Sequence, residues 1–408
     1  MRKPYAFTLI FMIISPAFSI GILTTPLYAN SNIVEEQTNN NGVTKWTIMV
    51  YLDADNNLDT YGVLNLQQIY AGLNPGANVN VVVLLDRLNE EAWLYDIKNR
   101  TNESLGELDM GSWETLRDFV VNVTRDFKSD YYMLILWDHG LGWPGICWDD
   151  TNSNSTYQSY ISPTNLTKAL TEAYEQTGKK VNIVGFDACL MGMIEICYEL
   201  KNVTDIVIGS EMLIPGYGWP YKEFMEYISN NPQVDPKTLS EAIVTQYVEY
   251  YSRIKPNFLV QLSAIDTSKI DKMSLNLNET SAYLAGNVES MRGLITGARS
   301  ASQQKFILGT MGVIFYVDLY KFADLLQKRT DDPILRDLAS NLTKSIDDMV
   351  FAENHTRPQG NLDEKQFGLT VYFPANRQTF IFKYPDYVPN FAVDTGWYNF
   401  LRAYCRIS

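Results

Sequence analysis

The pattern of apolar and polar residues predicts strands and helices that alternate along the first half of the chain. Short runs rich in Val, Ile and Leu, each bounded by glycine or polar residues, are typical of buried parallel strands. The predicted strands are 45–52, 79–85, 92–97 (a short edge strand), 131–137, 181–186 and 205–209, and the predicted helices are 59–73, 112–127, 162–176 and 190–200. Alternation of this kind predicts a mostly parallel sheet covered by crossover helices.

The regular alternation ends after residue 221. Helices are expected at 236–254, 267–291, 335–351 and around 397–404, with strands at 258–265 and 367–373. A chain of 408 residues is long enough for one large or two medium domains. We expect residues 45–265 to form the main α/β domain and residues 266–408 to form an α/β subdomain that packs on it.

The N-terminus has the order of a secretory signal. Arg2 and Lys3 precede an apolar stretch over residues 5–23, and the small residue Ala29 follows as a cleavage site. We predict a signal peptide at 1–29, a polar linker at 30–44, and a secreted or cell-surface protein. The alternative is an uncleaved N-terminal anchor, which would be the only membrane contact because no later segment is long and apolar enough to span a bilayer.

The charge balance narrows the range of partners. The chain has 33 Lys and Arg residues against 47 Asp and Glu residues, a formal net charge of −14. Nucleic-acid binding needs a basic face for phosphate contacts, so that class of function is excluded. The acidic surface could attract cationic substrates or calcium, but the charge alone favours a role in solubility. Four cysteines are too few for a disulfide framework at this length.

Two predicted strands end in residues that together suit catalysis. Strand 131–137 is followed by Asp138-His139-Gly140, and strand 181–186 by Asp187-Ala188-Cys189. In open α/β sheets, ligands bind beyond the carboxyl ends of the strands. A thiol and an imidazole at two such ends suit a cysteine nucleophile and its general base. Taken singly, each residue favours a structural role, and the occurrence of the pair at matching strand ends reverses that preference in favour of catalysis. A helix starting at residue 190 would also favour the Cys189 thiolate.

Other residues near these strand ends have candidate roles in binding. The backbone N–H groups of Gly140 and Cys189 could stabilise an oxyanion. Asp187 suits either binding of a substrate Lys or Arg side chain or acceptance of loop N–H groups. Glu211 is a candidate for a second acidic specificity group. Trp219, in a loop of glycines and aromatic residues, suits either a substrate pocket or anchoring of the loop on the core.

The segment 51–59 superficially resembles a calcium loop. It has alternating oxygen-bearing side chains, but Leu58 and Leu64 occupy the glycine and closing-glutamate positions of that pattern. We therefore predict that its acidic and amide side chains cap the following helix, and we predict no metal ligand in this segment.

Four segments, taken in order, resemble the clostripain-like cysteine peptidases, which are relatives of the caspases, gingipains and legumain. The segments are 47–58, 137–140, 185–191 and 210–219, so the resemblance covers residues 45–225 and is loose over 226–408. It implies a caspase-like three-layer α/β sandwich with a C-terminal α/β subdomain. It also implies that Cys189 is the nucleophile of a Cys–His dyad, with His139 as general base and acid.

The resemblance further assigns the oxyanion donors to Gly140 and Cys189, and places Asp187 in a pocket for basic substrate residues. Some members of the family need calcium, so calcium is an optional ion here and no other cofactor is assigned. The sequence thus predicts an exported endopeptidase that cleaves peptide or protein substrates after Arg or Lys. The alternatives are a catalytically inactive extracellular binding module with the same fold and, behind it, another thiol acyl-transfer enzyme such as a transpeptidase.

Overall fold

The computed structural model describes residues 44–154, 157–303, 315–356 and 368–407. Within these ranges, nine strands form one sheet in the order β12-β10-β9-β8-β5-β1-β2-β3-β4. The central strands β9, β8, β5, β1 and β2 run parallel, and the strands at both edges are antiparallel to their neighbours. The strand bounds are β1 Thr44–Ala54, β2 Val79–Arg87, β3 Glu90–Asp96, β4 Thr101–Gly106, β5 Ser129–Trp137, β8 Ile183–Asp187, β9 Ile206–Gly209, β10 Gln261–Asp266 and β12 Val350–His355.

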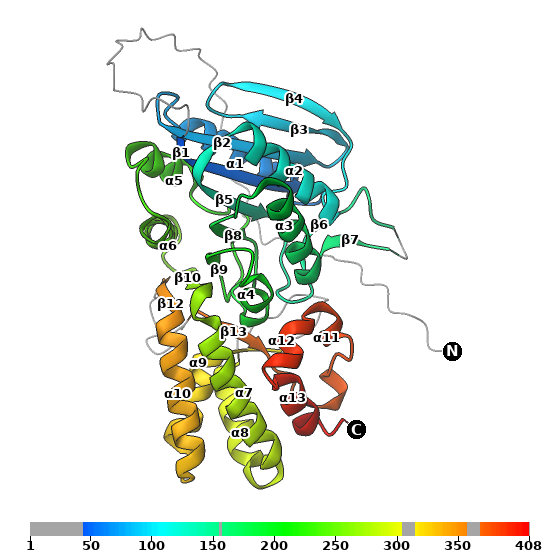
Figure 1. Cartoon of the computed structure of the whole chain (residues 1–408), viewed down its shortest axis with the longest axis vertical. Helices are drawn as coiled ribbons and strands as arrows, with labels where there is room; N and C mark the ends of the chain where they lie inside the picture. The colour runs from blue at the N-terminus through cyan, green and yellow to red at the C-terminus, as the bar shows by residue number, and fades with distance from the viewer. Residues whose placement is uncertain (1–43, 155–156, 304–314, 357–367, 408) are drawn as a thin grey trace.

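Helices cover both faces of this sheet, which gives three layers (Figure 1). One face packs against α2 (Trp113–Asp126), α3 (Pro163–Thr177) and α4 (Ile194–Leu200), and the other against α1 (Asp59–Gly72), α5 (Tyr221–Asn230) and α6 (Pro236–Ile254). Alternate residues of β1 enter the two cores: Met49 and Tyr51 on one face, Ile48 and Val50 on the other. Burial on both faces explains why this strand is a continuous apolar run.

The rest of the chain forms helices and a two-stranded sheet that lie below the strands in Figure 1. The elements are α7 Ile270–Gly286, α8 Val288–Ser302, β11 Tyr316–Asp318, α9 Leu319–Arg329, α10 Pro333–Met349, β13 Thr370–Tyr372, α11 Tyr384–Tyr387, α12 Pro389–Asp394 and α13 Trp397–Cys405. A second small sheet pairs β6 (Ile146–Asp149) with β7 (Ser159–Ile161).

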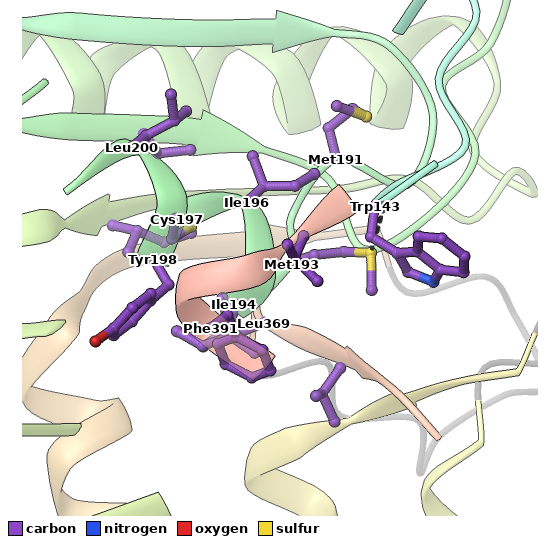
Figure 2. Close-up of a cluster of buried hydrophobic side chains, with 14 of the residues drawn as sticks. Trp143, Met191, Met193, Ile194, Ile196, Cys197, Tyr198, Leu200, Leu369 and Phe391 are labelled. Atoms are coloured by element: carbon purple, nitrogen blue, oxygen red, sulfur yellow. Dashed lines mark hydrogen bonds between the residues drawn. The ribbon is translucent and has the colours of Figure 1, made fainter. Parts of the chain in front are cut away.

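This C-terminal part is bonded to α4 and to the turn that precedes it. The Thr370 N–H donates to the Gly192 carbonyl at 2.9 Å, and the Phe391 N–H donates to a Glu199 carboxylate oxygen at 2.9 Å. Figure 2 shows Leu369 and Phe391 beside Ile194 of α4. Strand β12 also lies after residue 265 and pairs with β10 in the central sheet. The two parts therefore share a sheet, and the boundary at residue 265 stays a prediction.

Several predicted elements differ from the observed ones. The single helix expected at 267–291 is two helices that meet at Asn287. Strand 92–97 is not at the edge, because β4 pairs with its outer side. The helix expected from residue 190 begins at Ile194. The predicted signal peptide lies outside the described residues, and so does the predicted linker except for its last residue, Thr44, which begins β1. Among the helices that are described, none has the length and apolar character needed to cross a bilayer.

Candidate active site

His139 and Cys189 follow two neighbouring strands. β5 and β8 run parallel and pair Trp137 with Asp187, and His139 and Cys189 each lie two residues beyond that pair. Gly140 packs against the second turn so closely that an added Cβ atom would collide with the Cys189 carbonyl oxygen. The fold therefore brings the turn that carries the imidazole into direct contact with the turn that carries the thiol.

The imidazole of His139 is buried and bonded to Asn57. The distance between His139 Nε2 and Asn57 Oδ1 is 2.7 Å. Burial lowers the pKa of His139 to about 3, so the ring is neutral at physiological pH. An amide oxygen can only accept, so Nε2 carries the proton in this bond and Nδ1 is left with the lone pair of a base. Asn57 is not among the predicted site residues; its only signal in the sequence is its position just after a strand that neighbours β5.

The neighbouring Asn56 ties the turn that carries Asn57 to the turn that carries His139. Its Nδ2 donates to Asp138 Oδ1 at 2.7 Å and to the Trp148 carbonyl at 3.1 Å. Its Oδ1 accepts the Leu58 N–H at 2.8 Å. Leu58 is the N-cap residue of α1 and no side chain caps this helix, so the predicted capping by the segment is wrong. Since Asn56 and Asp138 are both buried, these bonds fix the distance between the Asn57 amide and the imidazole.

The thiol of Cys189 is partly buried and bonded to the loop that follows β9. Its Sγ accepts the Ile214 N–H at 3.2 Å. Burial raises the pKa of Cys189 to about 11, although the Ile214 N–H favours the thiolate. The Cys189 thiol and the His139 imidazole are therefore both neutral in the resting protein. All four cysteines lie within the described ranges, and none forms a disulfide.

The expectation that Cys189 stands at a helix N-terminus is wrong. Helix α4 starts at Ile194, and four residues separate it from the thiol. The first of these, Leu190, has a φ of +65°, and Gly192 packs against the backbone of Ser210, where an added Cβ would lie 2.8 Å from the Ser210 carbonyl carbon. Residues 190–193 therefore dock on the loop that follows β9, and the helix begins only after them. Partial charge at the helix end acts mainly within its first turn, so it cannot be the main source of thiolate here.

Asp187 lies beneath the loop that follows β9. Its Oδ2 accepts the Trp219 N–H at 2.9 Å, which is the loop-anchoring role that sequence analysis left open. Its Oδ1 is buried and has no partner of normal hydrogen-bond geometry among the described residues. Burial raises the pKa of Asp187 to about 7, and the Tyr221 hydroxyl that faces the carboxylate offsets part of that rise. One oxygen therefore anchors the loop, and the carboxylate also faces the Tyr221 hydroxyl.

The tryptophans near the site are packed into the fold. Trp219 is buried, and its ring covers Gly185 of β8, where an added Cβ would lie 2.7 Å from the ring. Its role in substrate binding stays a prediction. Trp143, four residues after His139, packs edge-on against the rings of Tyr372 and Tyr384. These ring contacts join it to the C-terminal part. Its backbone N–H donates to the Met193 sulfur at 3.3 Å, and Figure 2 marks this bond with a dashed line.

Glu211 is buried away from the thiol. Its backbone N–H donates to Gln261 Oε1 at 2.8 Å. Burial raises the pKa of its carboxyl group well above the usual range, and the nearby carboxylates of Asp318 and Glu353 add to the rise. Those neighbours belong to β11 and β12, so the Glu211 side chain faces the second part of the chain. The structure thus gathers His139, Gly140, Asp187 and Cys189, but not the Glu211 carboxylate.

The carboxylates of the segment that superficially resembles a calcium loop bind neighbouring loops. In the described part of the chain, no three His, Cys, Asp or Glu side chains converge as metal ligands. Both oxygens of Asp55 bind Thr151, at 2.8 Å to its hydroxyl and 3.2 Å to its N–H. Asp59 forms an ion pair with Arg87 at 2.9 Å. These carboxylates are already bound to side chains and backbone groups of other segments. We therefore derive no catalytic step through calcium.

Comparison with known proteins identifies the family. A sequence model of the clostripain family matches residues 50–404. The chain belongs to the clostripain family. Clostripain from Hathewaya histolytica is 25% identical to this chain over 486 aligned residues, which cover 98% of this chain and 89% of that protein.

Solved structures of clostripain-family (C11) proteases share the fold. Iotapain, a secreted C11 cysteine protease from Bacteroides thetaiotaomicron, has a TM-score of 0.61 at 20% identity, covering 81% of this chain and 93% of iotapain. An inactive zymogen C11 protease from Parabacteroides distasonis has a TM-score of 0.63 at 21% identity, covering 88% of this chain and 99% of its own. The predicted caspase-like α/β fold is therefore confirmed, and this clostripain-family chain is a cysteine-type endopeptidase.

Proposed function

We propose that this endopeptidase is exported and cleaves peptide bonds after Lys or Arg, with Cys189 as nucleophile and His139 as its base. The contact between the two turns that follow β5 and β8 carries the proposal. One of these turns bears a thiol and the other an imidazole, so the pair needed for nucleophilic catalysis stands at one edge of the sheet.

Acylation in this proposal couples proton transfer to attack. Burial moves the pKa of His139 to about 3 and that of Cys189 to about 11, so the resting pair is neutral. As Sγ attacks the carbonyl carbon of the substrate, Nδ1 of His139 takes the thiol proton. The carbonyl π electrons move to oxygen, where the N–H groups of Gly140 and Cys189 stabilise the oxyanion. The Asn57 amide oxygen stabilises the imidazolium through Nε2.

Loss of the amine completes acylation, and deacylation then returns the enzyme to its starting state. The carbon–nitrogen bond breaks as the imidazolium gives its proton to the leaving amine, and a thioester with Cys189 remains. A water molecule then gives a proton to His139 as its oxygen attacks the thioester carbon. The carbon–sulfur bond breaks, the thiolate regains the proton from His139, and the carboxylic acid product leaves.

Preference for Lys or Arg is proposed to come from Asp187. Its Oδ1 is a buried oxygen without a partner of normal geometry in the described residues, and it lies two residues before the nucleophile. A substrate ammonium or guanidinium group would form a charge-assisted bond there. Because Oδ2 is held by the Trp219 N–H, the carboxylate would need no rearrangement of its own to receive the cation.

Export is supported by the basic, apolar and small-residue order of residues 1–29. The test is N-terminal sequencing of the protein recovered from culture medium after expression of the full chain. A mature terminus near residue 30 is expected. Recovery only from membranes, with residue 1 retained, would replace secretion with anchoring.

The catalytic assignment is tested by labelling with a peptidyl acyloxymethyl ketone that carries Lys or Arg next to the warhead. We expect one label, at Cys189, and complete loss of labelling and peptide cleavage in Cys189→Ala. Cys405→Ala is the matched control, because it removes a thiol of the C-terminal helix and should keep both signals. Undiminished cleavage by Cys189→Ala would refute the assignment, and absence of any label on the wild type would favour a binding module.

A further inference from the structure

The loop that follows β9 presents an exposed aromatic ring beside the thiol. The loop is fixed at two points: the Ile214 N–H binds Cys189 Sγ at 3.2 Å, and the Trp219 N–H binds Asp187 Oδ2 at 2.9 Å. Between these points the chain bulges outward, and Tyr217 is 40% exposed. Three residues of chain span at most about 10 Å, so the ring is within reach of a peptide bound at Cys189.

Tyr217 belongs to a cluster of four side chains from three elements, which we call the Tyr217 patch: Tyr61 of α1, Tyr217, and Lys255 and Phe258 from the turn after α6. The rings of Tyr61 and Tyr217 meet edge to face, with centroids 5.6 Å apart. The Lys255 ammonium lies 5.1 Å from the Tyr217 ring centroid and 6.0 Å from that of Phe258. Phe258 is 44% exposed, so the patch offers two accessible aromatic rings joined by one cation.

The loop does not depend on the Tyr217 side chain for its anchoring. Its backbone is held by other groups: the Asn65 amide donates to the Tyr217 carbonyl at 3.0 Å, and the Tyr251 hydroxyl donates to the Gly218 carbonyl at 2.8 Å. The buried Trp219 ring fixes the far end. A clustered pair of exposed aromatics that the fold does not need is typical of a binding surface.

We infer that the Tyr217 patch binds an aromatic or large aliphatic side chain of the peptide substrate, within three residues of the cleaved bond. The inference rests on the proposed function, because Cys189 and Asp187 fix where the peptide lies. An extended peptide advances about 3.3 Å per residue, so such a residue spans the gap between thiol and patch. Burial of an apolar side chain on the two rings supplies the affinity, and edge-to-face contacts favour an aromatic one.

The test compares kcat/KM for internally quenched peptides of equal length. Each has Arg at the cleavage site and Phe, Leu or Ala at one of the three positions on either side. The wild type should prefer Phe or Leu over Ala by about tenfold at one position, and Tyr217→Ala should reduce that preference to about twofold or less. Turnover of N-acetyl-arginine methyl ester, which cannot reach the patch, should stay unchanged.

Phe382→Ala is the matched control. Phe382 is also exposed and packs edge-on against one aromatic ring, that of Phe380 at 5.2 Å, but it lies in the C-terminal part. It should keep the wild-type preference. Two results would overturn this inference but leave the proposed function intact. One is that Tyr217→Ala keeps the preference for Phe or Leu, and the other is that the wild type turns over the ester but shows no preference among the peptides. A wild type inactive on both the ester and the peptides would overturn the proposed function with it.

Discussion

Two groups of buried polar side chains lie at the carboxyl ends of the same sheet. The Cys–His edge consists of the turns after β5 and β8, with His139 and Cys189. The aspartate edge consists of Asp53 and Asp86, which are register partners at the ends of β1 and β2. Both aspartates are fully buried, and each has one oxygen, Oδ2, without a hydrogen bond from the described residues. Burial keeps the groups at both edges neutral, but the two edges differ in whether a proton can pass between neighbouring groups.

The difference lies in whether neighbours can exchange a proton. At the Cys–His edge, the proposed mechanism pairs a neutral acid with a neutral base of different chemistry, so that one proton would move from sulfur to nitrogen. At the aspartate edge, the two groups are alike, and burial raises the pKa of Asp86 to about 8 and that of Asp53 well above its usual range. Burial alone therefore does not make a reactive site; complementary partners do.

The two edges also respond to pH in opposite directions. Below its ordinary pKa of about 6.5, His139 takes up a proton in the unfolded chain but not in the folded one, so its contribution to stability falls as pH decreases from about 6.5 to 3. Asp86 keeps its proton in the folded chain up to pH about 8 but loses it near pH 4 when unfolded. Its contribution falls as pH rises through that range.

The largest expected effect is the loss of the base at the Cys–His edge. His139→Ala should lower kcat by about a thousandfold, because no group then accepts the thiol proton. The measurement is steady-state cleavage of an Arg peptide, with circular dichroism to confirm folding. His355→Ala removes the other histidine, whose Nδ1 lies 3.0 Å from Glu353 Oε1 on β12, and should keep kcat. Comparable losses in both variants would show a general destabilisation.

The next effect concerns stability and the aspartate edge. Asp86→Asn removes a buried carboxyl group whose ionisation at high pH destabilises the folded protein. The oxygen of the new amide can still accept the Arg87 N–H, which is bound to Asp86 Oδ1 at 2.9 Å in the wild type. The variant should be more stable than the wild type by about 2–4 kcal/mol at pH 8 and nearly equal to it at pH 4. Urea unfolding at the two pH values measures this difference.

Asp331→Asn is the control for this comparison, because Asp331 is exposed. It should unfold like the wild type at both pH values. If Asp86→Asn is destabilised at pH 8, the carboxylate is ionised and favourably bound in the folded protein, and the contrast between the two edges disappears.

The sequence predicted the parts of the molecule that depend on local pattern. The continuous apolar runs of β1, β5 and β8 can only be buried on both faces, and the polar residues after two of them marked the candidate site. Parallel neighbours end at the same edge, so His139 and Cys189 were expected together. Their turns do meet.

Features that depend on distant contacts were not predictable. The bond between Asn57 and His139 joins residues 82 positions apart, and no local pattern marks an exposed asparagine as the partner of an imidazole. The late start of α4 follows from docking of Gly192 on Ser210. The Glu211 carboxylate faces β11 and β12, whose positions follow from long-range pairing.

Asp187→Asn tests whether the charge next to the Cys–His edge selects substrates. The asparagine can still accept the Trp219 N–H, so the loop anchor is kept while the charge is lost. The ratio of kcat/KM for Arg over norleucine peptides should fall by about thirtyfold, because a buried charge pair with the substrate is lost. Equal losses on both peptides would mean that Asp187 serves only the loop.

The smallest effect is expected at Asn57, which acts through His139 and not on substrate. Asn57→Ala should lower kcat by about tenfold with little change in KM, because the ring loses the bond that fixes its tautomer. Asn57→Asp adds a negative charge at the same atom, which stabilises the imidazolium and raises the pKa of His139.

The pH profile separates this positioning role from a structural one. In Asn57→Asp, the acid limb of the pH profile of kcat/KM should move to higher pH than in the wild type. The reason is that the imidazole keeps its proton up to a higher pH, and it can act as a base only above that pH. Asn102→Ala, on the exposed edge strand β4, should change neither kcat nor the profile. A profile in Asn57→Asp that matches the wild type would show that the amide only holds the turn. The Cys–His edge would then rely on burial alone to keep its base neutral.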